Sequence, residues 1–219
     1  MWESLEAPWQ ACLEEAWTAY QAGSAPIGAV VLDKDGRVIS RGRSTEKESM
    51  AQGDALTGTP LSHAETNALI NLPYDDFPDL RDLAACHIYT TTEPCPLCLG
   101  AFYMSGVRTI HFAARDPYAG SVDLLGATPY MSHKPVTVER PSRPELETMI
   151  AAWYIESVLP SEPRRAEALA STWATMLPEG AALGRSLYAS GDLRRMADQK
   201  MPVASVIDAL AAQVRNLHT

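Results

Sequence analysis

Two short motifs that lie far apart in the chain constrain its fold more than any other feature. The first is His63-Ala64-Glu65 and the second is Glu93-Pro94-Cys95-Pro96-Leu97-Cys98. An imidazole and two thiolates are ligands that zinc accepts, and zinc prefers four tetrahedral positions. The set His63, Cys95 and Cys98 leaves the fourth position open, which is typical of a catalytic rather than a structural site. The fold must therefore bring both motifs together, with Glu65 beside the metal as the acid and base.

Two other interpretations of the cysteine pair explain less of the sequence. A Cys-x-x-Cys motif also occurs as a redox pair and as half of a four-cysteine zinc site. The redox interpretation gives no role to the upstream His-x-Glu, and the remaining cysteines, Cys12 and Cys86, are too far apart to form a second pair. With two of the four cysteines assigned to a metal, we expect no disulfide framework and a reducing, cytoplasmic compartment.

The size and composition indicate a globular protein. The chain has 219 residues, 46% of them hydrophobic, which is enough for one domain with a good core and a small appendage. No apolar run reaches the roughly 18 residues that a membrane span needs, so we expect no membrane partner. The opening residues, Met1-Trp2-Glu3, lack the basic region of a secretory signal.

The charge distribution argues against a partner that is bound through phosphates. The net charge is −9, and residues 1–160 carry −10 of it, from 11 Lys and Arg against 21 Asp and Glu. Residues 161–219 carry +1, from 7 basic and 6 acidic residues. Nucleic-acid binding needs clustered Lys and Arg, so the part with the metal motifs is not expected to bind nucleic acid.

Hydrophobic periodicity and turn residues predict alternating helices and strands up to residue 159. A long polar loop is expected over 43–62, and loops of this length are usually functional or disordered. The turn Asp33-Lys34-Asp35-Gly36 joins the first two strands as a hairpin. The expected helices are 2–22, 62–72, 96–105 and 145–159, and the expected strands are 27–32, 37–42, 87–91, 107–113 and 136–138.

The predicted helix starts bear on the two motifs. Ser62 followed three residues later by Glu65 fits a capping box, which would take the carboxylate away from a metal site. Cys95 and Cys98 lie on one side of the first turn of their helix, where the helix dipole favours thiolates. His111, on a later strand, is interpreted as a packed or rim side chain, because the metal set is complete without it.

A boundary is expected after residue 159, at Pro160 and Pro163. The remaining pattern is purely helical, with helices expected over 164–177, 180–189 and 202–217. We therefore predict a zinc-dependent domain over 1–159 and a helical C-terminal extension over 160–219.

These motifs resemble the cytidine deaminase-like superfamily, in particular the branch of tRNA adenosine deaminases and guanine deaminases. The resemblance covers about residues 1–159 and includes Pro26-Ile27-Gly28-Ala29, the two metal motifs and Ala114-Arg115-Asp116-Pro117. It implies a three-layer α/β/α fold with a five-stranded mixed sheet. It also implies one zinc ion per chain, water as co-substrate and a homodimer.

The resemblance further implies hydrolytic removal of an amino group, with release of ammonia. The backbone near Ala64 and Glu93 would hold the base, and Asp116 and Tyr118 would close over it or contact it. The sequence differs from the family after the second strand, where Gly42-Arg43-Ser44-Thr45 contains no Asn and the segment before His63 is longer.

The expected substrate is a small nucleobase or nucleoside, either cytosine- or triazine-like or guanine-like. Two alternatives remain open: a tRNA-specific adenosine deaminase, and a binding module that zinc stabilises without catalysis. A purely structural zinc site needs four protein ligands and no adjacent acid, so Glu65 distinguishes the last alternative.

Overall fold

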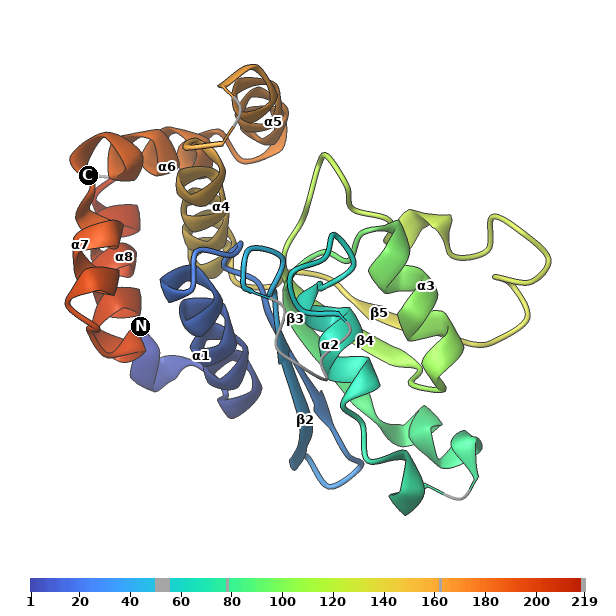
Figure 1. Cartoon of the computed structure of the whole chain (residues 1–219). Helices are drawn as coiled ribbons and strands as arrows, with labels where there is room; N and C mark the ends of the chain where they lie inside the picture. Colours follow the sequence, from blue (N-terminus) through green and yellow to red (C-terminus); the bar gives the residue numbers. More distant parts are fainter. Residues whose placement is uncertain (50–55, 78, 162, 218–219) are drawn as a thin grey trace.

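A five-stranded mixed sheet forms the centre of the protein (Figure 1). The computed structural model describes residues 1–49, 56–77, 79–161 and 163–217. The sheet has the order β2-β1-β3-β4-β5, in which β1 is antiparallel to β2 and β3 while β3, β4 and β5 run parallel. The strands are β1 (Gly28–Leu32), β2 (Val38–Arg43), β3 (His87–Thr92), β4 (Thr109–Ala114) and β5 (Thr137–Glu139).

Helices cover both faces of this sheet, which confirms the predicted three-layer α/β/α arrangement. The helices α1 (Ala7–Gln21) and α4 (Pro144–Val158) pack on one face, against β1 and β4 respectively. The helices α2 (Ala64–Ile70) and α3 (Pro96–Ser105) lie side by side on the other face (Figure 1). The parallel strands β3 and β4 end beside the start of α3, because β3 leads into this helix and the Glu93 N–H between them donates to the Ala114 carbonyl at the end of β4 at 2.8 Å.

Gly42 in β2 allows α2 to approach the sheet closely. A Cβ at this position would lie 2.3 Å from both the carbonyl oxygen of Ala64 and the backbone nitrogen of Ala68. Such distances are far below van der Waals contact, so only glycine fits here without a shift of the helix. This close approach places the first turn of α2, with His63 and Glu65, at the end of the sheet.

The C-terminal helices pack on α1 and α4 and share a hydrophobic core with them. The helices are α5 (Pro163–Met176), α6 (Pro178–Ser190), α7 (Asp192–Asp198) and α8 (Val203–Asn216). One buried cluster joins Trp17 of α1 and Trp153 of α4 to Leu187, Leu193 and Leu210 of the later helices. The predicted helices correspond to α5, α6 and α8, whereas α7 was not predicted.

The predicted elements agree with the observed ones to within a few residues. The turn after β1 forms as expected, with Gly36 at φ +78° and the Asp33 carboxylate accepting from the backbone N–H groups of Asp35 and Arg37. The helix expected over 2–22 is divided into a 3-10 helix at Trp2–Ser4 and α1, which begins at Ala7 with Pro8 in its first turn. Short 3-10 helices at Tyr74–Asp76, Leu80–Ala85 and Val122–Leu124 were not predicted. Of the expected loop over 43–62, residues 50–55 lie outside the described residues. Within the described part of the chain, no helix is long and apolar enough to cross a membrane.

Candidate active site

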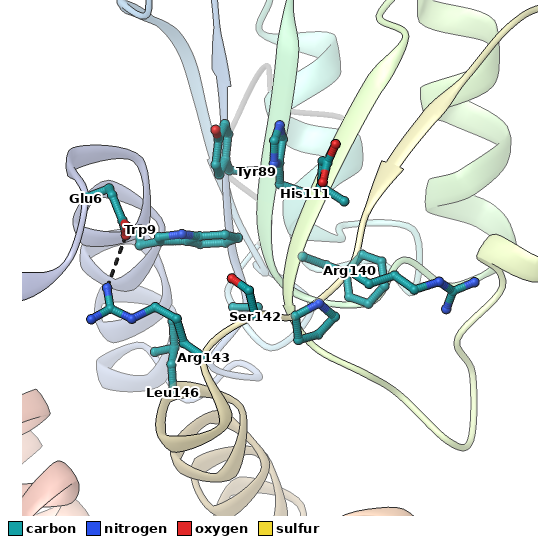
Figure 2. A pocket seen from close by; sticks show the side chains of 12 residues that line it. Glu6, Trp9, Tyr89, His111, Arg140, Ser142, Arg143 and Leu146 are labelled. Carbon is teal, nitrogen blue, oxygen red and sulfur yellow. Dashed lines mark hydrogen bonds and ion pairs between the residues drawn. The ribbon is translucent and has the colours of Figure 1, made fainter.

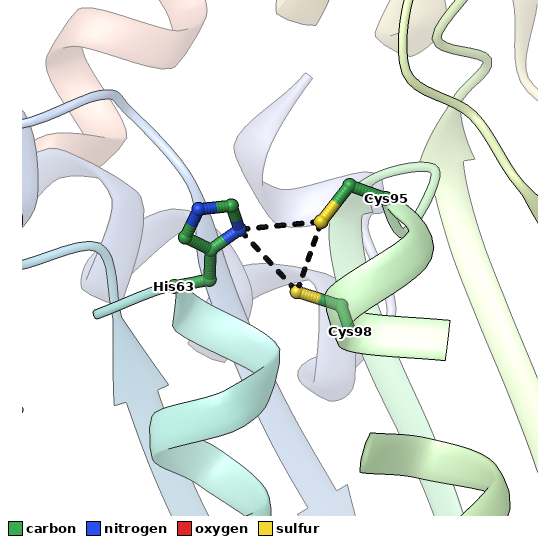
Figure 3. Close-up of side chains that lie close together, drawn as sticks. All are labelled: His63, Cys95 and Cys98. Atoms are coloured by element: carbon green, nitrogen blue, oxygen red, sulfur yellow. Dashed lines mark hydrogen bonds between the residues drawn. The ribbon is translucent and has the colours of Figure 1, made fainter. Parts of the chain in front are cut away.

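The two motifs meet at the starts of two neighbouring helices. His63 is the N-cap residue of α2, and Cys95 is the N-cap residue of α3, directly after β3. Pro96 occupies the first turn of α3. A backbone N–H at this position would have no hydrogen-bond partner within the helix, so proline costs no helical hydrogen bond here. Because α2 and α3 pack side by side, the side chains of His63, Cys95 and Cys98 converge (Figure 3).

The three side chains are spaced as zinc ligands. His63 Nδ1 lies 3.4 Å from each sulfur, and the two sulfurs are 3.6 Å apart. Tetrahedral zinc with usual bond lengths separates two sulfurs by about 3.8 Å and a nitrogen from a sulfur by about 3.5 Å. All four cysteines are free, so the sulfurs are not bridged. The residues present therefore fit a zinc ion, with Nδ1 as the ligand atom of the histidine.

The thiol pair carries opposite pKa shifts. Contact with the Cys98 thiol, and then with His63, lowers the pKa of Cys95 to about 4. Contact with Cys95, together with burial, raises the pKa of Cys98. Thiolates are the form that binds metal, so Cys95 is ready as a ligand whereas Cys98 must release its proton when a metal binds.

Glu65 points into the same site. Its side chain is 4% exposed, and its Oε2 accepts a hydrogen bond of 3.3 Å from the Cys98 thiol. Burial raises the pKa of this carboxyl above its usual range. A carboxyl group with a raised pKa next to a candidate metal site is suited to accept and return a proton.

The capping box that the sequence allowed is not formed. The N-cap of α2 is His63, without a side-chain hydrogen bond to the helix. The Ser62 hydroxyl instead bonds to the Leu56 carbonyl and the Thr59 backbone N–H. The Glu65 carboxylate is therefore free to face the metal ligands.

Glu46 is a neighbour of the site that the sequence pattern did not single out. Its Oε1 lies 3.5 Å from His63 Nε2, on the side of the ring opposite the sulfurs. Contact with Cys95, and next with Glu46, raises the pKa of His63 to about 10. Glu46 stands in the polar segment after β2, where no motif or periodicity marks it.

The residues expected to contact substrate lie around the same end of the sheet. Ala64 is fully buried at the first position of α2. The Glu93 carboxylate accepts from the backbone N–H groups of Asp116 and Val122, each at 3.3 Å, so it braces the loop after β4. Asp116 accepts from the N–H groups of Tyr118 and Ala119, and burial raises its pKa. The Tyr118 side chain is exposed.

A separate cavity of about 250 Å³ lies on the face of the sheet that carries α1 and α4 (Figure 2). Its wall includes Trp9, Tyr89 and His111, and Glu6 pairs with Arg143 at its edge. The His111 ring stacks on Tyr89 with centroids 4.0 Å apart and contacts the His87 ring nitrogen at 3.0 Å. None of the metal-site residues lines this cavity, and His111 is a packed side chain of the opposite face.

Comparison with known families gives a match to the first half of the chain. The family model described as the cytidine and deoxycytidylate deaminase zinc-binding region matches residues 3–114. The matched range contains His63, Glu65, Cys95 and Cys98. The group that the geometry selects for a metal thus falls inside a region whose family binds zinc.

Among curated proteins, the chain is similar to several enzymes that differ in length. It is 31% identical over 125 residues to a probable cytosine deaminase of Schizosaccharomyces pombe, with 50% of this chain and 68% of that protein covered. It is 34% identical over 89 residues to a guanine deaminase of Bacillus subtilis, with 41% and 50% covered. It is 33% identical over 126 residues to a tRNA(Ile)-lysidine synthase of Deinococcus radiodurans, with 55% of this chain but only 19% of that protein covered.

A solved structure supports the same fold. A tRNA:A34 deaminase, studied for A-to-I editing at the wobble position of transfer RNA, superposes with a TM-score of 0.50 and 28% identity. The match covers 61% of this chain and 91% of that one. The cytidine deaminase-like fold expected from the sequence is therefore confirmed.

Proposed function

The chain belongs to the cytidine and deoxycytidylate deaminase zinc-binding family, and from this premise we propose that it is a zinc-dependent hydrolytic deaminase of a small nucleobase or nucleoside. The observation that carries the proposal is the position of Glu65, buried and within hydrogen-bond distance of Cys98 in the group that fits zinc. A structural zinc site needs four protein ligands and does not require an adjacent acid.

The proposed reaction exchanges an amino group for an oxygen. Water adds to the ring carbon that bears the amino group, the carbon–nitrogen bond breaks, and ammonia leaves. His63, Cys95 and Cys98 would hold a zinc ion, which would supply a water molecule whose pKa is lowered to about 7. Glu65 takes one proton from the attacking water and delivers it to the ring nitrogen. It then takes the proton of the newly added hydroxyl group and passes it to the departing amine, so that the carbon keeps the oxygen and ammonia carries the proton away.

The burial of Glu65 suits this double role. A solvated glutamate is almost fully ionised at neutral pH and is a poor donor, whereas burial raises the pKa of Glu65. The same carboxyl group can then accept and return a proton within one cycle.

We propose Ala64, Glu93, Asp116 and Tyr118 as substrate contacts. Ala64 and Glu93 would act through their backbone, because the Glu93 carboxylate is engaged by the loop after β4. Asp116 and Tyr118 lie on that loop and would contact or cover the base. A neutral free base is favoured over a phosphorylated one, since residues 1–160 carry a net charge of −10. The similarity to a cytosine deaminase supports a single-ring base, and the similarity to a guanine deaminase supports a double-ring base.

An ammonia-release screen tests this function. The zinc-loaded chain is incubated with cytosine, guanine, adenine, their nucleosides and triazine analogues, and Glu65→Gln serves as the inactive control. We expect ammonia and the matching oxo product from at least one base with the wild type only. Ammonia at equal rates from both proteins would contradict the assignment of Glu65, and no turnover of any compound would contradict the substrate class.

The second candidate function is editing of adenosine in tRNA. The superposition on a tRNA:A34 deaminase, over 91% of that chain, favours it. The net charge of −10 on residues 1–160 opposes it, because tRNA binding relies on basic side chains. Inosine formation in a tRNA anticodon arm, with no turnover of free bases, would favour this function over the first.

We also propose that the chain forms a homodimer. Leu97 and Met104 are exposed and lie seven residues apart on α3, hence on the same side of the helix, and Ile70 is exposed on the adjacent α2. Exposed apolar side chains on one layer mark interaction surfaces. Light scattering should give twice the mass of the chain, and Met104→Glu should shift the protein toward the monomer.

The proposed setting is a reducing compartment such as the cytoplasm. The free state of Cys12, Cys86, Cys95 and Cys98 supports it.

A further inference from the structure

The two ring nitrogens of His63 face different partners. Nδ1 lies 3.4 Å from both sulfurs, so it is the nitrogen that points at the metal position (Figure 3). Nε2 lies 3.5 Å from Oε1 of Glu46. A neutral imidazole carries one proton, and the nitrogen that binds a metal must be the one without it.

The backbone around Glu46 is tied to the core of the domain. The Thr45 N–H donates to the Ser62 carbonyl at 3.0 Å, directly before His63. The Thr45 carbonyl accepts from the N–H groups of Glu48 and Gly58, and the Lys47 N–H donates to the Ser24 hydroxyl. Glu46 is thus held in a turn that is bonded to the same segment that carries the metal ligand.

The other acid of this turn has a different partner. The Glu48 carboxylate pairs with the Arg43 guanidinium at 2.7 Å. Within the described part of the chain, Glu46 pairs with no cation other than His63, and it is partly buried, with 32% of its side chain exposed. A half-buried carboxylate beside an imidazole is screened less by solvent than a surface pair.

We propose that Glu46 is a positioning residue for the zinc ligand His63. Its carboxylate holds the proton of the ring on Nε2, which leaves the lone pair of Nδ1 facing the two sulfurs. It also fixes the orientation of the ring and increases the basicity of the ligand, as carboxylate partners of zinc-binding histidines do. This inference rests on the zinc centre of the proposed function.

Zinc affinity of the full-length protein tests the role of Glu46. The wild type, Glu46→Ala, Glu46→Gln and the control Glu14→Ala are stripped of metal and titrated with zinc against a chromophoric chelator. Glu14 of α1 is a matched control, because its carboxylate is also paired with a cation, Arg41 of β2, but on the surface and outside the metal site. We expect the dissociation constant to rise by about 10- to 100-fold in Glu46→Ala. We expect a smaller rise in Glu46→Gln, which keeps an acceptor oxygen, and no change in Glu14→Ala.

The thermal stability of the metal-free variants separates positioning from folding. If Glu46 acts through His63, its loss lowers the stability of the metal-free protein only by the small contribution of the Glu46–His63 pair, whereas added zinc raises the melting temperature of Glu46→Ala clearly less than that of the wild type. Equal zinc affinity in the wild type and Glu46→Ala would overturn the inference, and so would a loss of metal-free stability that accounts for the whole effect. A wild type that binds no zinc would overturn the zinc centre itself, which is a distinguishable result.

Discussion

At the scale of single residues, the site combines charged groups whose surroundings shift their pKa values in opposite directions. Burial raises the pKa of Glu65, whereas contact with Cys98 and His63 lowers the pKa of Cys95 to about 4. One group is prepared to carry a proton and the other to give its proton up to a metal. Divided roles of this kind are typical of catalytic sites.

The substitution Glu65→Gln separates metal binding from proton transfer. Glutamine has nearly the same size but cannot accept and return a proton, so we expect ammonia release to fall by about 10²- to 10⁴-fold. The zinc content and the melting temperature should stay close to those of the wild type. Loss of zinc from this variant would instead indicate that Glu65 supports the metal site.

His111 should make stability depend on pH. Burial, and next the charge of His87, lowers its pKa from 6.5 to about 4, so the folded state favours the neutral ring. The corresponding stability is complete above pH 6.5 and is lost as pH falls from 6.5 toward 4, because the unfolded chain binds the proton first. In urea unfolding at pH 6.5 and 5, the free energy of unfolding of His111→Gln should fall less than that of the wild type. Equal losses in both proteins would contradict this expectation.

At the scale of elements, the position of α2 depends on its contact with β2 at Gly42. A methyl group there would meet the backbone at Ala64 and Ala68 rather than a side chain that can move aside. The helix carries Glu65 and follows His63, so its distance from the sheet also sets the metal site.

Gly42→Ala is therefore expected to destabilise the protein by about 1–3 kcal/mol, the usual range for overpacking. Zinc affinity should fall as well, because α2 is displaced. Gly100→Ala is the matched control, since a Cβ at Gly100 in α3 meets nothing within 4 Å. Chemical unfolding of both variants checks this, and equal stability of the two would show that α2 adapts without strain.

Element positions and the metal group could be predicted from the sequence because their signals are local. Gly36, Pro96 and the spacing of Cys95 and Cys98 each reflect one turn or one helix start. The contact of Glu46 with His63 could not be predicted, because it joins a loop without periodicity to a distant helix cap. The sequence could not decide whether Ser62 and Glu65 form a capping box for a similar reason. The hydrogen bond from the Ser62 hydroxyl to the Leu56 carbonyl depends on how the segment before His63 folds.

At the scale of the whole molecule, two buried apolar clusters and one buried carboxylate join the C-terminal helices to α1 and α4. Glu156 of α4 is fully buried, accepts from the Tyr20 hydroxyl of α1 at 2.8 Å and pairs with Arg194 of α7 at 3.1 Å. We propose that residues 160–219 act as a helical extension that stabilises the zinc-dependent part over 1–159. Their boundary stays a prediction.

Arg194→Met tests this connection, because it leaves the Glu156 carboxylate buried without its cation. We expect a loss of about 1–3 kcal/mol in the free energy of unfolding, the usual result of depriving a buried polar group of its partner. Arg195→Met is the control, since Arg195 pairs with Asp192 on the surface, where ion pairs contribute little. Denaturant unfolding of the two variants should differ, and matching curves would argue against a role of Arg194 in joining the parts.

The zinc content of the purified chain and of its Cys95→Ser and His63→Ala variants tests the central claim most directly. The geometry predicts one zinc ion per chain in the wild type and substantially less in either variant, because each removes one of three protein ligands. Full zinc occupancy in either variant would contradict the assignment of His63, Cys95 and Cys98 as the metal centre.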